Sequence, residues 1–251
     1  MANGLENFDI KDMAFQGRER RIIVSKSSGP PVVILHEVFG VTESLMAFAE
    51  MIQAAGFRVY MPVLFGSPEP KKMNAAGIAK GTAEFLCVQH QFRVFSSNDS
   101  GPWADWLRYL ADWASSDSGH AKVGAIGLCL TGNFALSMAV NDKVAAPVLG
   151  EPSLPFLVDG LHLTPDELDK LKQRVAEGLE VRAYRYVTDK KCKAALFLKL
   201  ESELAPGFTG TTLPTMEKLH SVFTEHLRDA DGQLRHDKVQ EVIDFLRSRL
   251  V

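Results

Sequence analysis

The chain has 251 residues, of which 46% are hydrophobic and 24% are charged, and this is ordinary for a large globular domain with a substantial core. Its net charge of −3 lacks the basic excess of nucleic-acid-binding proteins, so we expect no nucleic-acid partner. No apolar run approaches the roughly 20 residues needed to cross a bilayer, and we expect no membrane association.

The cysteines and the N-terminus bear on the compartment. The 3 cysteines, at positions 87, 129 and 192, are odd in number and far apart, which argues against a disulfide framework. Residues 1–12 are polar and lack the basic start and apolar stretch of a signal peptide. We therefore expect a reducing, cytoplasmic location.

The first part of the chain alternates between strand and helix patterns. Residues 21–24 predict a strand at the edge of a sheet, and 32–35 form the continuous apolar run of a strand buried in a parallel sheet. Residues 42–55 have the apolar face of a helix, and 57–62 predict the next strand. This strand–helix–strand order favours a parallel sheet.

Residues 63–101 show no clear period, and we expect them to face the site and to contain some helix. Pro102 begins a helix that runs through Trp113, with tryptophans that repeat at helical spacing and are expected in the core. The remaining elements are expected as strands over 144–149, 181–187 and 208–213, and as helices over 164–177, 190–203 and 235–250. Without an internal repeat or a linker rich in Pro, Gly or Ser, we expect a single domain over 1–251, with 63–101 and 152–180 as site-covering insertions.

Residues 123–139 predict a buried strand, a sharp turn and a buried helix, with Cys129 at the turn. A nucleophile in this position is typical of the nucleophile elbow of the α/β-hydrolase fold, here with Cys in place of the usual Ser. The small residues Gly127 and Gly132 suit the close approach of strand and helix. Thr131 departs from the common pattern, which has Gly there. On this stretch alone, an ordinary buried cysteine is the alternative.

A thiol with an ordinary pKa of about 8.5 needs a base or a positive neighbour to act as a nucleophile at neutral pH. In this fold class the acid and then the histidine follow the nucleophile. Asp189 directly follows the strand predicted over 181–187 and is the favoured acid. Both His220 and His226 follow the last predicted strand, and we favour His220 because His226 lies in a charged run typical of the surface.

These motifs together give the chain a family resemblance. It resembles the dienelactone hydrolase family of cysteine α/β-hydrolases over most of residues 20–250. The resemblance implies an α/β-hydrolase fold, with a mostly parallel central sheet and helices on both faces. The motifs that carry it are Leu35-His-Glu-Val-Phe-Gly40, Gly127-Leu-Cys-Leu-Thr-Gly132, Thr188-Asp189 and His220-Ser221.

The resemblance also implies roles for single residues. Cys129 would be the nucleophile, His220 the base and Asp189 the residue that orients it. Glu37 would lie beside the thiol and influence its protonation. The amides of Val38 and Leu130 would form the oxyanion hole, which agrees with one donor after the nucleophile and one from a loop after an early strand.

The implied reaction is a two-step acyl transfer that opens a lactone or ester, as in a carboxymethylenebutenolidase, and it requires no metal or organic cofactor. The family's typical substrate carries a carboxylate, for which Arg93 is the candidate partner. A general carboxylesterase or thioesterase is one alternative, and a non-hydrolytic thiol-sensing or binding protein, suggested by Thr131, is the other. We expect a monomer or a small homo-oligomer.

Overall fold

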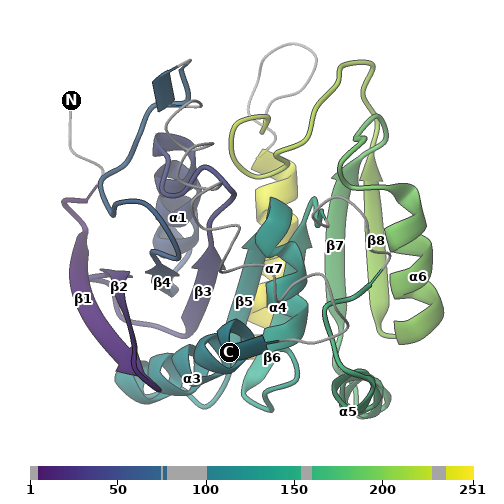
Figure 1. Ribbon diagram of the computed structural model, residues 1–251, viewed down its shortest axis with the longest axis horizontal. Helices are drawn as coiled ribbons and strands as arrows, with labels where there is room; N and C mark the ends of the chain where they lie inside the picture. The colour runs from purple at the N-terminus through teal and green to yellow at the C-terminus, as the bar shows by residue number, and fades with distance from the viewer. Residues whose placement is uncertain (1–4, 75, 78–100, 154–159, 228–235) are drawn as a thin grey trace.

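The computed structural model describes residues 5–74, 76–77, 101–153, 160–227 and 236–251, and Figure 1 shows their twisted central sheet with helices on either side. In this described part, 8 strands form one sheet in the order β1-β2-β4-β3-β5-β6-β7-β8. β1 pairs with β2 and β2 with β4 in antiparallel fashion, whereas all later pairs are parallel. The strands are β1 (Phe8–Phe15), β2 (Arg18–Ser25), β3 (Pro31–Leu35), β4 (Arg58–Pro62), β5 (Val123–Leu128), β6 (Val144–Gly150), β7 (Val181–Tyr186) and β8 (Phe208–Leu213).

The parallel part of the sheet has a hydrophobic core on each face. Successive residues of β3 point to opposite sides, so that Val33 and Leu35 join one core and Val32 and Ile34 join the other. Every residue of β3 is buried. This explains why its sequence is a continuous apolar run rather than an alternating one.

The helices cover both faces, as the predicted fold class requires. Helices α3, α4, α5 and α6 contribute to the core on one side of the sheet, and α1 and α7 to the core on the other. Two of them begin with side-chain caps: the Thr42 hydroxyl accepts the N–H of Leu45, and Thr164 and Glu167 form a capping box. The helices are α1 (Glu43–Ala54), α3 (Gly101–Ser118), α4 (Gly132–Met138), α5 (Pro165–Ala176), α6 (Ala194–Leu204) and α7 (His236–Leu250).

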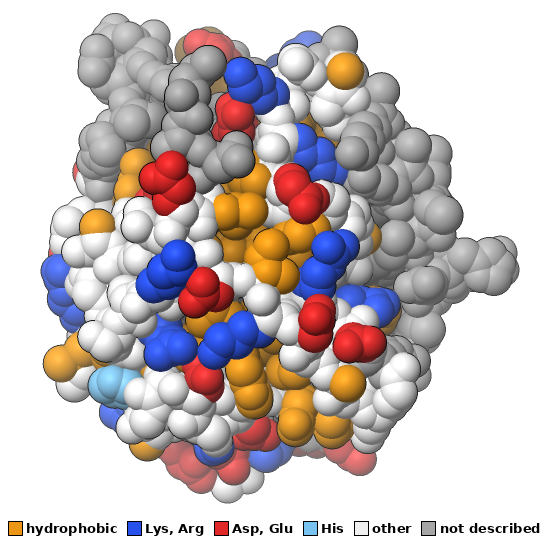
Figure 2. Space-filling view, turned by 90° about the vertical axis from the view of Figure 1, so that its left-hand side faces the viewer, with side chains coloured by type: hydrophobic (Ala, Val, Ile, Leu, Met, Phe, Trp, Pro, Cys, Tyr) orange, Lys and Arg blue, Asp and Glu red, His pale blue; other side chains and the backbone are white. Residues whose placement is uncertain are grey.

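The antiparallel edge of the sheet differs from the prediction. Residues 21–24 were expected at the edge, but they belong to β2, which is covered on its outer side by β1. In β1 only Phe8 and Met13 are buried, so its sequence lacks a clear strand period. Figure 2 looks onto this side of the molecule and shows charged side chains of both signs interspersed with apolar ones, an arrangement that discourages pairing with a further strand.

In the described part of the chain, no helix combines the length and the apolar character that a transmembrane span requires.

Candidate active site

The turn after β5 holds Cys129 in a strained conformation. Cys129 opens a short 3-10 helix, η2 (Cys129–Thr131), and its φ of +56° lies in the left-handed region that costs a non-glycine residue about 1–3 kcal/mol. A Cβ on Gly127 would lie 2.1 Å from the Thr131 carbonyl oxygen, and one on Gly132 would lie 2.7 Å from Cα of Pro152. The geometry is therefore that of the predicted elbow, and both glycines are required by close backbone approach.

Thr131 holds this turn together through its side chain. Its hydroxyl accepts the N–H of Leu128 at 2.9 Å and lies 3.1 Å from the carbonyl oxygen of Leu35 and 3.2 Å from that of His36. A glycine at this place offers none of these contacts. The departure from the common elbow pattern thus ties the turn to the end of β3, where the next loop of the site begins.

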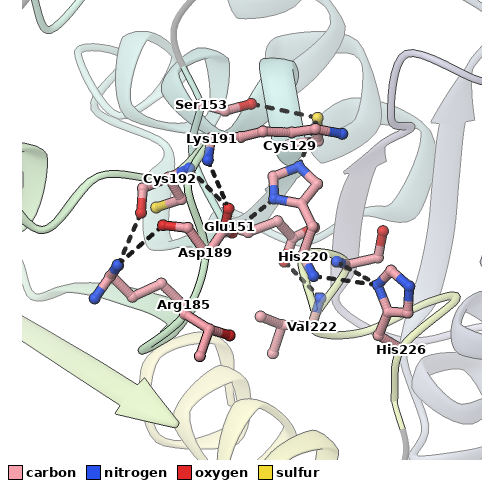
Figure 3. Close-up of polar contacts among 12 residues, drawn as sticks. Cys129, Glu151, Ser153, Arg185, Asp189, Lys191, Cys192, His220, Val222 and His226 are labelled. Carbon is pink, nitrogen blue, oxygen red and sulfur yellow. Dashed lines mark hydrogen bonds and ion pairs between the residues drawn. The ribbon is translucent and has the colours of Figure 1, made fainter. Parts of the chain in front are cut away.

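Three predicted site residues from three loops lie in a row (Figure 3). The His220 ring places Nε2 3.1 Å from Sγ of Cys129 and Nδ1 2.6 Å from Oδ2 of Asp189. The second carboxylate oxygen of Asp189 accepts the backbone N–H groups of Lys191 and Cys192 at 2.8 and 3.1 Å. Asp189 is therefore fixed at one side of the imidazole, and the thiol lies at the other.

The charges of this row favour a protonated imidazole. Burial acts to lower the pKa of His220, but the hydrogen bonds to Asp189 and to Cys129 outweigh it and raise this pKa to about 11. Burial opposes ionisation of Asp189 as well, yet the hydrogen bond and charge of His220 hold the pKa of Asp189 below its ordinary value. An imidazolium next to sulfur stabilises the thiolate, which is the nucleophilic form of cysteine.

Glu37, on the loop after β3, contacts the loop that contains His220. It is buried, and its two carboxylate oxygens accept hydrogen bonds from the hydroxyls of Ser221, at 2.9 Å, and Thr224. The contacts of this carboxylate therefore run to the residues that follow the histidine. The structure thus brings Glu37 into the cluster through the His220 loop.

His226 has a position that the sequence did not suggest. Its Nδ1 accepts the backbone N–H groups of His220 and Ser221 at 3.2 and 3.0 Å, and its own carbonyl accepts the Tyr186 hydroxyl at 2.6 Å. Burial and then the nearby charge of His220 lower the pKa of His226. His226 is half-buried and not fully exposed as the charged run suggests, because the chain turns back after His220 and the ring closes this turn.

Two further residues near the row carry no sequence signal that we recognised. Ser153, after β6, has its hydroxyl 3.3 Å from Sγ of Cys129, and its N–H donates to the Cys129 carbonyl at 3.0 Å. The buried Arg185 on β7 donates from Nε to the carbonyl of Cys192 at 2.9 Å and from Nη2 to that of Asp189 at 3.3 Å. Arg185 thus fixes the loop that contains the acid.

The other predicted positions are less directly placed. Val38 follows Glu37 on the loop after β3, and Leu130 follows Cys129 at the start of η2. Arg93 and most of 63–101 lie outside the described residues. The segment 152–180 was expected to cover the site. Its residue Ser153 contacts the thiol of Cys129. Arg174 of α5, in contrast, donates to backbone carbonyls that precede β6, at the end of that strand away from the site. Within the described residues, no group of at least 3 His, Cys, Asp or Glu side chains could hold a metal ion.

Comparisons with known proteins bear on the family and the fold of the chain. The model of the Dienelactone hydrolase family matches residues 20–157. A dienelactone hydrolase from Anabaena variabilis has a similar structure, with a TM-score of 0.67 and 16% identity over 98% of this chain and 100% of that one. A dienelactone hydrolase-like promiscuous phosphotriesterase from metagenomic libraries has a TM-score of 0.68 and 15% identity over 97% of this chain and 98% of that one.

An esterase extends the same comparison. A cold-adapted esterase from an Arctic intertidal metagenomic library has a TM-score of 0.60 and 17% identity over 96% of this chain and 93% of that one. At such identities, the structural likenesses show a shared fold. No curated protein matches the chain.

Proposed function

Because the chain belongs to the dienelactone hydrolase family, and is thus a carboxylic-ester hydrolase, we propose that it opens a lactone or ester through a thioacyl-enzyme on Cys129. The observation that carries this proposal is the row of side chains in which His220 lies between the thiol and Asp189, at 3.1 and 2.6 Å. A general base held by a carboxylate next to a nucleophile is the arrangement that acyl transfer requires.

In the first step, the thiolate of Cys129 attacks the carbonyl carbon of the substrate. A C–S bond forms, and the carbonyl π electrons move to the oxygen, which the amides of Val38 and Leu130 stabilise. When the tetrahedral intermediate collapses, the bond to the leaving oxygen breaks, and protonated His220 donates its Nε2 proton to that oxygen. A lactone is opened but stays attached through the thioester.

In the second step, neutral His220 accepts a proton from a water molecule as that water attacks the thioester carbonyl. Collapse of the second intermediate breaks the C–S bond, releases the carboxylic acid and returns the thiolate beside the imidazolium. Asp189 stabilises the positive ring in both steps and keeps Nε2 directed at the sulfur. We assign Arg93 to the carboxylate of an acidic substrate.

Intact-mass spectrometry tests this mechanism on enol-lactones with and without a carboxylate, aryl esters and thioesters. We expect a transient acyl adduct on the wild type and turnover that Cys129→Ala lowers by about 10³-fold or more, the scale set by removal of a catalytic nucleophile. Preference for carboxylate-bearing lactones supports the dienelactone hydrolase activity, whereas broad turnover of aryl esters or thioesters supports the general esterase.

A matched control separates chemistry from folding. Asp189→Asn keeps the size of the side chain but removes its charge, and we expect it to lower kcat strongly, by up to about 10⁴-fold. Turnover that survives Cys129→Ala would contradict the proposal. Alkylation of Cys129 by iodoacetamide without an acyl adduct or turnover of any substrate would instead support the thiol-sensing alternative.

A further inference from the structure

The loop that contains His220 is held by buried carboxyl groups at three successive residues. Each carboxyl comes from a loop after a different parallel strand, namely β7, β3 and β6. One binds the imidazole, the next a hydroxyl and the third a backbone N–H. The pairs are His220 with Asp189 at 2.6 Å, Ser221 with Glu37 at 2.9 Å and Val222 with Glu151 at 2.8 Å.

Glu151 is the member of this set with the least favourable surroundings. Its side chain is buried with 0% exposure, and its backbone φ of +35° lies in the left-handed region. One oxygen, Oε2, accepts the N–H of Val222, while Oε1 has no hydrogen-bond partner among the described residues. Backbone strain and an orphaned buried oxygen at one residue are costs that a purely structural position rarely combines.

The two neighbouring glutamates differ in their hydrogen bonds. Glu37 accepts two hydroxyl hydrogen bonds, which stabilise a carboxylate, whereas Glu151 accepts a single N–H. Burial raises the pKa of Glu151 well above its ordinary value and the charge of Glu37 raises it further, while the charge of His220 and the N–H of Val222 oppose this shift without cancelling it. A fully buried carboxyl with one hydrogen bond and an acid beside it favours its neutral, protonated form, and we assign that form to Glu151.

We propose that Glu151 is a positioning residue for His220, which in its neutral, protonated form holds the N–H of Val222 and so fixes the imidazole between Cys129 and Asp189. The proposal rests on the proposed function, because it gives Glu151 a part in the same thiol chemistry. Glu151 acts through the loop and not on the substrate. Above its raised pKa, ionisation of Glu151 would place a buried negative charge on this carboxyl and loosen the support.

Two substitutions separate the hydrogen bond from the charge. Glu151→Gln keeps a neutral acceptor of the same length, and we expect kcat and KM to stay within about threefold of the wild type at neutral pH. Glu151→Met keeps the volume but offers no comparable acceptor, and we expect kcat to fall by about tenfold or more with little change in KM. If Gln lowered kcat as far as Met, a charged Glu151 would be required and the proposal would be wrong. A Met variant with wild-type kcat would equally overturn it.

The pH dependence gives a second readout. A carboxyl with a raised pKa keeps its proton in the folded state at pH values where the unfolded chain has lost it, so stability falls as pH rises above about 4.5 towards the raised value. We therefore expect the Tm of Glu151→Gln, relative to that of the wild type, to increase as pH rises from about 5 to about 9. A constant difference across this range would contradict a neutral Glu151.

The other ionisable groups near Glu151 are present in both proteins. They lie on the loops after β3, β5 and β7 and on the histidine loop: Glu37, Cys129, Cys192 and His220. Comparison of the two proteins therefore isolates Glu151. Neither Tm nor the rate at which iodoacetamide alkylates Cys129 requires a substrate. A wild type that turned over no ester would defeat the proposed function, yet a slower alkylation in Glu151→Met than in Glu151→Gln would still support the positioning role.

Discussion

Thr131 shows how one hydroxyl substitutes for the flexibility that glycine provides in a nucleophile elbow. Its oxygen accepts the N–H of Leu128, which would otherwise be a buried donor without a partner at this turn. Thr131→Val has nearly the same shape but lacks the hydroxyl, so we expect it to lower the free energy of unfolding by about 1–3 kcal/mol. We also expect a lower kcat, because the turn that carries Cys129 loses its tie to Leu35.

Urea unfolding and steady-state kinetics measure both effects. Thr131→Ser is the matched control, since it keeps the hydroxyl and removes only a methyl group. We expect the Ser variant to stay close to the wild type in activity. A Val variant as stable and as active as the wild type would show that the hydroxyl has no part in holding the elbow.

At the residue scale, the sequence predicted the candidate reacting side chains but not the side chains that hold them in place. Cys129, Asp189 and His220 could be chosen from residue type and chain order, because the fold class fixes which loops meet at the site. The structure brings these three side chains together. Ser153 and His226 could not be chosen, since their contacts depend on the direction of side chains across loops that are distant in sequence.

Among the elements, the strands and helices with strong periodicity or caps were the predictable ones. The helix expected over 164–177 forms as α5, with a capping box of Thr164 and Glu167 at its start, and the continuous apolar run of β3 is buried as expected. β1 could not be foreseen, because only Phe8 and Met13 are buried in it and its stability comes from pairing with β2. Tertiary pairing, rather than local preference, forms this edge.

The histidine loop is the element on which activity should be most sensitive. His226→Phe fills a similar volume but removes the acceptor for the N–H groups of His220 and Ser221. We expect kcat to fall by about tenfold or more, because two buried donors lose their partner and the imidazole loses its fixed position. Steady-state kinetics, together with circular dichroism to verify the fold, tests this expectation.

His226 also makes the stability of the protein depend on pH in the acid range. With its pKa lowered in the folded state, His226 binds fewer protons there than in the unfolded chain, so stability falls as pH drops below about 6.5. We expect the Tm difference between the wild type and His226→Phe to shrink as pH falls from about 7 to 5. An unchanged difference would mean that the Nδ1 contacts do not stabilise the loop.

Across the whole molecule, the two ends of the sheet have different tasks. The loops at the carboxyl ends of β3, β5, β6, β7 and β8 carry the candidate site residues, as is general for parallel sheets. At the other end, the carboxylate of Asp117, near the end of α3, contacts two cationic side chains and one hydroxyl of the sheet. Its partners are Lys11 at 3.1 Å, Arg58 at 2.8 Å and the Tyr60 hydroxyl at 2.9 Å.

This separation predicts a variant that loses stability without losing activity. Asp117→Ala leaves the buried hydroxyl of Tyr60 and the guanidinium of Arg58 without their shared acceptor, so we expect a loss of about 2 kcal/mol in the free energy of unfolding. We expect kcat to stay within about twofold, because the site lies at the opposite end of the strands.

Burial opposes ionisation of Asp117, but Tyr60, Lys11 and Arg58 lower its pKa, so this stabilisation is present above the ordinary pKa and disappears as pH falls through the lowered pKa. Urea unfolding at neutral and acid pH should therefore show the two proteins converging in acid, whereas a parallel loss of kcat would show that the two ends of the sheet are coupled.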